Sequence, residues 1–363
     1  MAKYAFSLNH CLKKRTPFAM PEFAKPVIRN IWVLLMLMLT ALSPANAETL
    51  TPAQAYEKGK ILHFQDKFEE AEPYLLQAGE SGYSAAYYLI ANAGHLNRYL
   101  MSDKEYKFKK LAAENGHLMA MIGLTMPRSI SPQKKYWRNT IQNILSPHAD
   151  KNNPLALQMQ GYATPIEEYD EMSLLKTAAY AGYPKAQWKL ARRYESGESW
   201  FFLPGSREKE VAKLYEAAAR GGYHEAIWYK GVRAVKSGDI EGGMGILQTL
   251  IDKGDASKVS SLGFMLSELP DIDDAWSYDD KMLGSTYLRA TATAMSDFDD
   301  TFEVFDKEAA KLLTDEEKVQ VDKLAEEYLS NHTVYKQDGL DEYEYTVDNL
   351  HTALERWGGN AIE

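Results

Sequence analysis

Small and apolar residues recur at helical spacing through the middle of the chain. After Gly182 they stand four, eight, nine and twelve residues further on, at Ala186, Leu190, Ala191 and Tyr194. Residues at these offsets lie on one face of an α-helix. The stretch 176–197 therefore predicts two helices that meet at Gly182. Pro184 falls in the first turn of the second helix, where its missing N–H costs little.

The same pattern recurs at intervals along the chain. Its anchor positions are Gly82, Gly116, Asn152, Gly182, Gly222 and Gly254. They are 34, 36, 30, 40 and 32 residues apart, a period typical of a solenoid built from helical hairpins. We expect each anchor glycine to end one helix in a left-handed cap, at the corner of a hairpin. An alanine four residues later lets the next helix pack closely, except after Gly254, where Lys258 takes its place.

Two of these stretches resemble Sel-like repeats, a family related to tetratricopeptide repeats: AAYAGYPKAQWKLARRYESG at Gly182 and AAARGGYHEAIWYKGVRAVKSG at Gly222. The resemblance covers residues 50–270 and is weakest around 152 and 254. It implies an all-α fold, a right-handed superhelical solenoid of helix–turn–helix repeats whose concave face contacts proteins. It does not imply catalysis. The chain departs from the family pattern after Gly197, where a longer link extends one unit to 40 residues.

Both ends of the predicted array carry helix-start signals. Thr51 to Gln54 has the pattern of a capping box with proline at the first helical position. Thr314 and Glu317 form a second box before an amphipathic helix at 313–329. The candidate apolar contacts of that helix are Val319, Val321, Leu324 and Tyr328. The tail beyond 331 predicts a turn at Asp338–Gly339 and a final helix near 345–356.

Residues 268–306 lack the repeat pattern and carry eleven acidic residues against two basic ones. This composition fits either an acidic insertion or a divergent helical segment. We therefore expect three parts: a signal peptide at 1–47, the Sel-like solenoid at 48–267, and an acidic, divergent helical capping region at 268–363.

The first 47 residues have the pattern of a secretory signal peptide. Basic residues precede an apolar run at 31–42, and Ala45-Asn46-Ala47 is a small-x-small cleavage pattern. The run of about 12 residues is too short to span a bilayer comfortably. We expect cleavage after Ala47 and a periplasmic protein without stable membrane insertion; the main alternative is an uncleaved anchor. No cysteine follows the run, which excludes a lipoprotein anchor.

The net charge of the chain limits the classes of partner that it can bind. Removal of residues 1–47 changes the formal net charge from −10 to −15. Such acidity argues against nucleic acid and anionic membranes as partners, because both are themselves negative. It favours a cation or, as we expect, a protein partner with a basic surface.

The sequence lacks the patterns of a catalytic or cofactor site. It has no HExxH, GxSxG, GxxxxGK[ST] or GxGxxG motif. Its only cysteine lies in the predicted signal peptide at 1–47, here called the leader. His117 and His224 follow corner glycines, where we expect them to be exposed. The acidic stretch 271–282 lacks the glycine and glutamate of a calcium-binding loop. We predict a non-enzyme without metal or cofactor.

The link SWFFLPG, residues 199–205, is the most unusual feature. Large apolar side chains gain about 1.5–3 kcal/mol each when buried, so their presence in a link requires an explanation. Either they fold back over the neighbouring repeat, or they anchor a partner. The candidate partner-binding residues are Trp200, Phe201, Phe202, Trp188, Trp228 and Tyr229. We expect the last three, with Tyr87 and Tyr88, to pack mainly in the core.

The resemblance implies two functions, both non-catalytic. Exported Sel-like proteins include immunity proteins that bind and inhibit type VI secretion lipases in the periplasm. Lipid-anchored relatives act as envelope assembly scaffolds, for example in polysaccharide export. The partner, the binding face and the oligomeric state stay open at this point.

Overall fold

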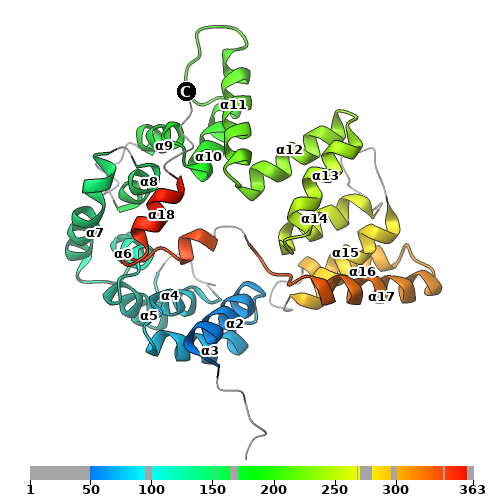
Figure 1. Ribbon diagram of the computed structural model, residues 1–363, viewed down its shortest axis with the longest axis horizontal. Helices are drawn as coiled ribbons and strands as arrows, with labels where there is room; N and C mark the ends of the chain where they lie inside the picture. Colours follow the sequence, from blue (N-terminus) through cyan, green and yellow to red (C-terminus); the bar gives the residue numbers. More distant parts are fainter. Residues whose placement is uncertain are drawn as a thin grey trace, which may run out of the picture. The chain divides into compact units, whose positions relative to one another are not determined.

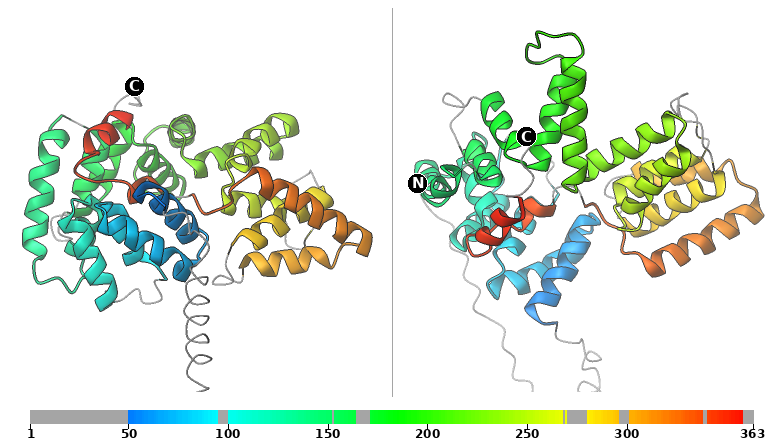
Figure 2. Two further views of the ribbon diagram at one scale, coloured as in Figure 1. Left: turned by 60° about the horizontal axis from the view of Figure 1, so that its bottom comes forward. Right: turned by 45° about the horizontal axis from the view of Figure 1, so that its top comes forward.

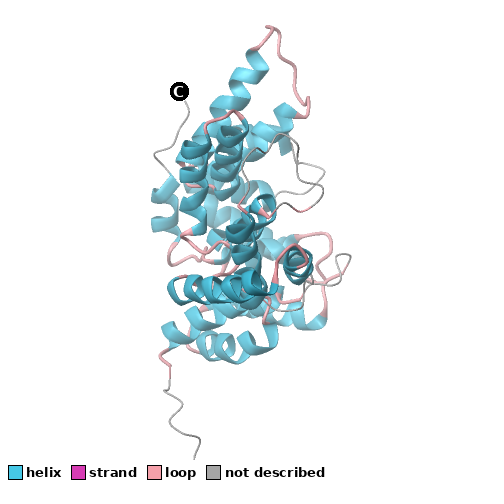
Figure 3. Ribbon diagram, turned by 90° about the vertical axis from the view of Figure 1, so that its right-hand side faces the viewer, coloured by secondary structure: helices cyan, strands magenta, loops and turns pink. Residues whose placement is uncertain are grey.

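The computed structural model describes residues 50–94, 100–151, 153–163, 171–267, 269, 280–295, 301–337 and 340–357. These residues form α-helices without a β-strand, apart from two isolated β-bridges (Figure 3). The predicted leader lies outside them. Six pairs of successive helices, from α3–α4 to α13–α14, are the predicted hairpins (Figure 1). The helices are α2 (Pro52–Phe64), α3 (Phe68–Glu80), α4 (Ser84–Asn92), α5 (Asp103–Glu114), α6 (Leu118–Thr125), α7 (Lys134–Ala149), α8 (Pro154–Ala163), α9 (Glu171–Tyr180), α10 (Pro184–Glu195), α11 (Ser206–Arg220), α12 (His224–Lys236), α13 (Ile240–Ile251), α14 (Ala256–Leu266), α15 (Lys281–Ala294), α16 (Thr301–Ala310), α17 (Asp315–Asn331) and α18 (Leu350–Trp357).

A glycine with left-handed backbone stands at the corner of five hairpins. The φ angles are 102° at Gly82, 86° at Gly116, 109° at Gly182, 84° at Gly222 and 70° at Gly254. At each corner the N–H after the glycine donates to the carbonyl five residues before it, as from Tyr183 to Ala178 at 3.0 Å. This is the Schellman closure, which satisfies a carbonyl that the helix end leaves open. The sixth anchor, Asn152, lies outside the described residues.

The alanines four residues after the anchors are buried as predicted. None is more than 1% exposed: Ala86, Ala120, Ala156, Ala186 and Ala226. With only a methyl group at this position, the second helix of each hairpin can approach its neighbour closely. At the last hairpin Lys258 occupies the position, and its side chain is 7% exposed. Its ammonium pairs with the Glu225 carboxylate, which offsets part of the cost of burying the charge.

Both predicted capping boxes are present. In α2 the Thr51 hydroxyl accepts a hydrogen bond from the Gln54 N–H at 3.3 Å, and the Gln54 side chain accepts from the Thr51 N–H at 2.9 Å. Thr314 and Glu317 make the same reciprocal pair at the start of α17. These bonds satisfy backbone donors that a helix start leaves open.

One predicted contact in α17 is wrong. Val319 is 70% exposed, whereas Val321 is 1% exposed. The helix packs on α15 with a single face, and two residues separate positions by about 200° around a helix. Val319 therefore points away from the face that contains Val321.

The acidic segment is helical where the structure describes it. It contains α15, which packs on α14, and the start of α16. Arg289 of α15 pairs with Asp306 of α16 at 2.9 Å and also with Asp322 of α17. One basic residue thus ties three helices together. The calcium-loop-like stretch 271–279 lies outside the described residues.

Residues 333–357, here called the C-terminal strap, return to hairpins that come much earlier in the chain (Figures 1 and 2). Tyr335 pairs with the α13–α14 corner: its N–H donates to the Gly254 carbonyl at 3.1 Å, and its carbonyl accepts from the Ala256 N–H at 3.0 Å. The next N–H, of Lys336, donates to the Phe64 carbonyl at 3.0 Å. The strap therefore joins the last hairpin to the end of α2.

Further along, the strap also pairs with the α5–α6 corner, where the bridge is antiparallel rather than parallel. The Val347 N–H donates to the Gly116 carbonyl at 2.8 Å, and the Leu118 N–H donates to the Tyr345 carbonyl at 2.9 Å. Helix α18 then packs on α8. It begins at Leu350, within the range predicted for a final helix. The predicted turn at 338–339 lies outside the described residues.

In the part of the chain that the structure describes, no helix is both long enough and apolar enough to cross a membrane.

Candidate protein-binding surface

The large apolar side chains of the link between α10 and α11 fall into two groups, exposed and packed. Trp200, Phe202 and Leu203 are 81%, 89% and 73% exposed. Phe201 instead packs edge-on against Tyr194, with ring centroids 5.1 Å apart. Phe201 thus folds back onto the neighbouring repeat, whereas the other three side chains are exposed to the solvent.

Backbone geometry and one arginine hold this link. Gly197, Ser199 and Gly205 have φ angles of 96°, 69° and 76°. The Arg207 guanidinium donates to the carbonyls of Tyr194 at 2.8 Å and Ser199 at 3.0 Å, and lies 5.1 Å from the Phe201 ring. The base of the loop is therefore fixed on α10, so the exposed side chains are presented from an ordered support.

The remaining candidate aromatics pack mainly against other side chains. Trp188 and Tyr229 contact a large apolar cluster, and their rings lie 5.8 Å apart. Trp228 packs against a separate cluster, formed by α12, α13 and α14 with Tyr287. Tyr87 and Tyr88 are also partly buried. The six predicted binding residues therefore do not form one surface.

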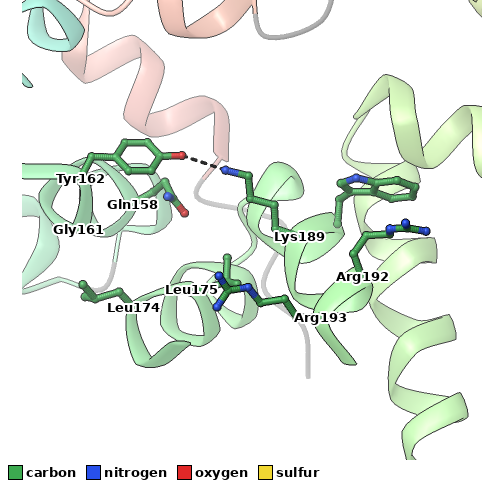
Figure 4. Close-up of a pocket in the computed structure, with 9 residues that line it drawn as sticks. Gln158, Gly161, Tyr162, Leu174, Leu175, Lys189, Arg192 and Arg193 are labelled. Carbon is green, nitrogen blue, oxygen red and sulfur yellow. Dashed lines mark hydrogen bonds between the residues drawn. The ribbon is translucent and has the colours of Figure 1, made fainter. Parts of the chain in front are cut away.

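A pocket lies beside the link, between α8, α9 and α10 (Figure 4). Its volume is about 270 Å³. The lining residues are Gln158, Gly161, Tyr162, Leu174, Leu175, Trp188, Lys189, Arg192 and Arg193. Three of these described lining residues are cations. The Lys189 ammonium donates to the Tyr162 hydroxyl at 3.4 Å.

The two arginines of this pocket connect it to the link. Arg192 pairs with Glu195 at 3.2 Å, and Arg193 pairs with Glu198 at 3.7 Å. Glu195 also accepts a hydrogen bond from the Tyr215 hydroxyl at 2.7 Å. The two glutamates lie outside the lining of the pocket, at the end of α10 and the start of the link. They fix the arginine side chains from that side.

Local charge here is opposite to that of the whole chain. Residues 171–236 carry 12 Lys and Arg against 7 Asp and Glu, a net charge of +5. The rest of the chain after residue 47 carries 23 basic and 43 acidic residues, a net charge of −20. The exposed aromatic residues therefore sit in a basic part of an acidic protein, which the net charge alone conceals.

The expectation that His117 is exposed is wrong, because its side chain is fully buried under the strap. Its Nδ1 accepts from the Ala120 N–H at 3.2 Å, so Nε2 carries the proton and donates to the Tyr343 carbonyl at 2.9 Å. The ring stacks on Tyr88 at 4.2 Å. Burial lowers the pKa of His117 from 6.5 to about 4. Neutral His117 therefore holds the strap through its hydrogen bond to the Tyr343 carbonyl.

His224 is also less exposed than expected. Its side chain is 17% exposed, and Nδ1 lies 2.7 Å from the carboxylate of the fully buried Asp255. Asp255 is the residue that precedes α14, next to Gly254. The pair ties the start of α12 to the α13–α14 corner. Neither histidine belongs to a group of residues that could hold a metal ion among those described.

Comparison with family models and with curated proteins gives no match. Among solved structures, the chain is similar to a protective antigen of uropathogenic Escherichia coli strains that displays an SLR fold, with 14% identity and a TM-score of 0.42 over 78% of this chain. It spans 62% of that protein's length. It is also similar to a Sel1 repeat protein from Oxalobacter formigenes, with 16% identity and a TM-score of 0.32, over 87% of this chain and 97% of that one.

The architecture itself is settled by the hairpins of this chain. Each of the five described corner glycines lies between two helices, has left-handed backbone and precedes a buried residue four positions later. In the part of the chain that the structure describes, the fold is an all-α solenoid of helix–turn–helix hairpins.

Proposed function

We propose that this chain is a non-catalytic, periplasmic protein-binding protein. The observation that carries the proposal is the exposure of Trp200, Phe202 and Leu203 on a link held in place by Arg207. Exposed clusters of large apolar residues mark interaction sites, and aromatic anchors supply much of the binding energy in interfaces. A support that is already ordered lowers the entropic cost of binding.

The more specific proposal is that it is an immunity protein that binds and inhibits a phospholipase or lipase delivered by type VI secretion. The resemblance to exported Sel-like proteins and the leader pattern support this role. The charge of −20 outside residues 171–236 complements a basic cleft that accommodates phospholipid phosphates. Such complementarity would speed capture and disfavour other partners. Inhibition needs only a surface that covers the cleft.

Competition between bacterial strains tests this role. Cells that lack the gene should become sensitive to siblings that deliver the cognate lipase, and an exported copy should restore resistance. A copy that lacks residues 1–47 should not restore it, because it stays in the cytoplasm. If the deletion strain is not sensitive and the purified chain binds envelope-assembly proteins instead, the alternative of an assembly scaffold replaces the immunity role.

The leader gives a separate prediction. The mature chain should begin at Glu48, after the small-x-small pattern at 45–47. N-terminal sequencing of the protein from a periplasmic extract measures this directly. A chain of full length that remains in the inner membrane fraction would show that the apolar run is an anchor.

Substitutions at exposed and at packed residues of the link should have different effects on partner binding and on stability. Trp200→Ala with Phe202→Ala should leave the melting temperature within a few degrees, because both side chains are exposed. It should weaken partner binding at least ten-fold, about 1.4 kcal/mol. Phe201→Ala is the matched variant: it removes the packing against Tyr194 and should lower the melting temperature. Thermal unfolding and a binding titration measure both effects. A double variant that unfolds would show that the exposed residues are structural.

A further inference from the structure

Three exposed apolar side chains lie around the start of α7, and none of them is part of the link. Leu100, Ile130 and Tyr136 are 62%, 43% and 58% exposed. Leu100 stands before α5, Ile130 lies between α6 and α7, and Tyr136 is in the first turn of α7. Together with Lys134 and Lys135 of the same turn, they are here called the α7 patch.

Hydrogen bonds bring these three segments of the chain together. The Met101 N–H donates to the Arg128 carbonyl at 3.1 Å, which places the end of the preceding segment beside the connection between α6 and α7. The Lys134 ammonium donates to the Pro127 carbonyl at 3.2 Å, which ties the start of α7 to the same connection. The residues of the patch therefore belong to one region of the surface.

The charge of this region is positive. Residues 115–149 carry four Lys and Arg and no Asp or Glu, which makes them the longest stretch after residue 47 without an acidic residue. Among the described residues, no carboxylate forms an ion pair with Lys134, Lys135 or Arg138. The patch therefore carries positive charge that the fold itself does not neutralise.

The acidic residues of the neighbouring helix α5 do not cancel this charge. Glu105 pairs with Lys109 at 2.9 Å and also with Arg128, and its side chain is only 3% exposed. Glu114 is at the opposite end of α5. That leaves the exposed Asp103, in the first turn of α5, against the two lysines of the patch.

Helix stability does not explain these two lysines. The first turn of α7 contains no acidic residue, and Gln133 makes no side-chain capping bond there. The N-terminus of a helix carries a partial positive charge, so cations are unfavourable and anions favourable at this position. A negatively charged ligand at the patch would remove the conflict.

The mixture of side chains favours a lipid surface over other anions. Lysine keeps its ammonium group at the level of the headgroups, and tyrosine is enriched there because one end of its ring is polar. Leucine and isoleucine gain free energy by entering the boundary of the acyl chains. A soluble anion such as phosphate offers no such gain to the apolar side chains.

We propose that the α7 patch docks this protein on the surface of a bilayer that contains anionic phospholipid. The inference goes beyond the proposed function, because it adds a second binding surface made of residues outside the link. The net charge of the chain predicts the opposite, but exposed charges more than about 8 Å apart are largely screened at physiological ionic strength. The lysines of the patch therefore govern its contact with lipid.

Cosedimentation with vesicles tests the patch directly. The chain used begins at Glu48, which keeps the compact unit Thr51–Glu363 and omits the apolar run at 31–42, itself able to bind lipid. It should bind vesicles of phosphatidylcholine with phosphatidylglycerol, less as salt rises, and far less to phosphatidylcholine alone. Lys134→Gln with Lys135→Gln should weaken binding by about ten-fold or more, because each lysine near an anionic surface strengthens binding several-fold.

Two further double variants test the apolar contact and the position of the charge. Leu100→Ser with Tyr136→Ser should also weaken vesicle binding, and circular dichroism should show an unchanged fold because both side chains are exposed. Lys209→Gln with Arg220→Gln is the matched charge control: these exposed residues lie on α11, and their replacement changes the net charge equally. We expect it to change vesicle binding by less than about two-fold.

Trp200→Ser with Phe202→Ser separates the patch from the link and should leave vesicle binding intact. Vesicle binding that is lost in this link variant but kept in the α7 variants would overturn the proposal. So would equal losses in the two lysine and arginine variants, binding that does not depend on phosphatidylglycerol, or no binding at all. A chain that ignores vesicles but still captures its partner through the link leaves the proposed function intact, so the two failures are distinguishable.

Discussion

Gly254→Ala is expected to lower the free energy of unfolding by about 3–4 kcal/mol. Its φ of 70° costs an alanine about 1–2 kcal/mol. An added Cβ would also lie 2.3 Å from the Thr333 carbonyl oxygen, so the strap has to move. That movement breaks the two backbone hydrogen bonds between Tyr335 and the corner, which contribute about 1 kcal/mol each. Chemical denaturation of both proteins measures the difference.

Gly222→Ala provides the matched comparison. Its φ is 84°, but an added Cβ meets no atom within 4 Å. Only the backbone strain remains, and the expected loss is about 1–2 kcal/mol. Equal losses at the two glycines would show that the strap is not packed on the α13–α14 corner.

Acidification from pH 7 to pH 4 is expected to remove about 3 kcal/mol of stability through His117. Burial lowers its folded pKa from 6.5 to about 4, with Lys109 lowering it further and the hydrogen bond to Tyr343 opposing the shift. Between these values the unfolded chain binds a proton and the folded chain does not. Stability therefore falls as pH drops below 6.5 and is unaffected by His117 above about 7.

A substitution isolates this effect from other titrations. In His117→Asn the side-chain oxygen can still cap α6 by accepting from the Ala120 N–H, and no proton binds near neutral pH. Its stability should depend less on pH between 6.5 and 4, although it is lower overall because the stacking on Tyr88 is lost. His351→Gln is the control, since that side chain is 83% exposed. A wild-type slope in His117→Asn would contradict the assignment.

The sequence predicts the parts of this fold that depend on local interactions. A left-handed glycine, a Schellman closure and a capping box each involve residues within about six positions of one another. The hairpin corners at Gly82 and Gly182 and the caps at Thr51 and Thr314 therefore follow from short patterns. The buried alanines follow from the same register.

The strap could not be predicted in this way. Its pairing depends on backbone groups at Gly116 and Gly254, which lie some 80 to 230 residues away in the chain and carry no side-chain signal for it. His117 illustrates the consequence. It stands at the corner of its own hairpin, where Tyr88 of the preceding hairpin and the strap cover it.

The candidate surface was predicted in part. The aromatic link was visible as an interruption of the repeat, but the sequence pattern does not distinguish the buried Phe201 from the exposed Phe202. The pocket was missed because its lining comes from three helices of two hairpins. A count of charges by segment indicates a basic region at 171–236, whereas the net charge of the whole chain points to the opposite sign.

Photocrosslinking in living cells tests the central claim that the link is the partner interface. A photoreactive phenylalanine at position 202 should give one discrete protein adduct, because this side chain is 89% exposed on the proposed interface. The same residue at position 319, which is 70% exposed on α17, should not give it. An identical adduct pattern from the two positions, or no protein adduct from position 202, would contradict the account.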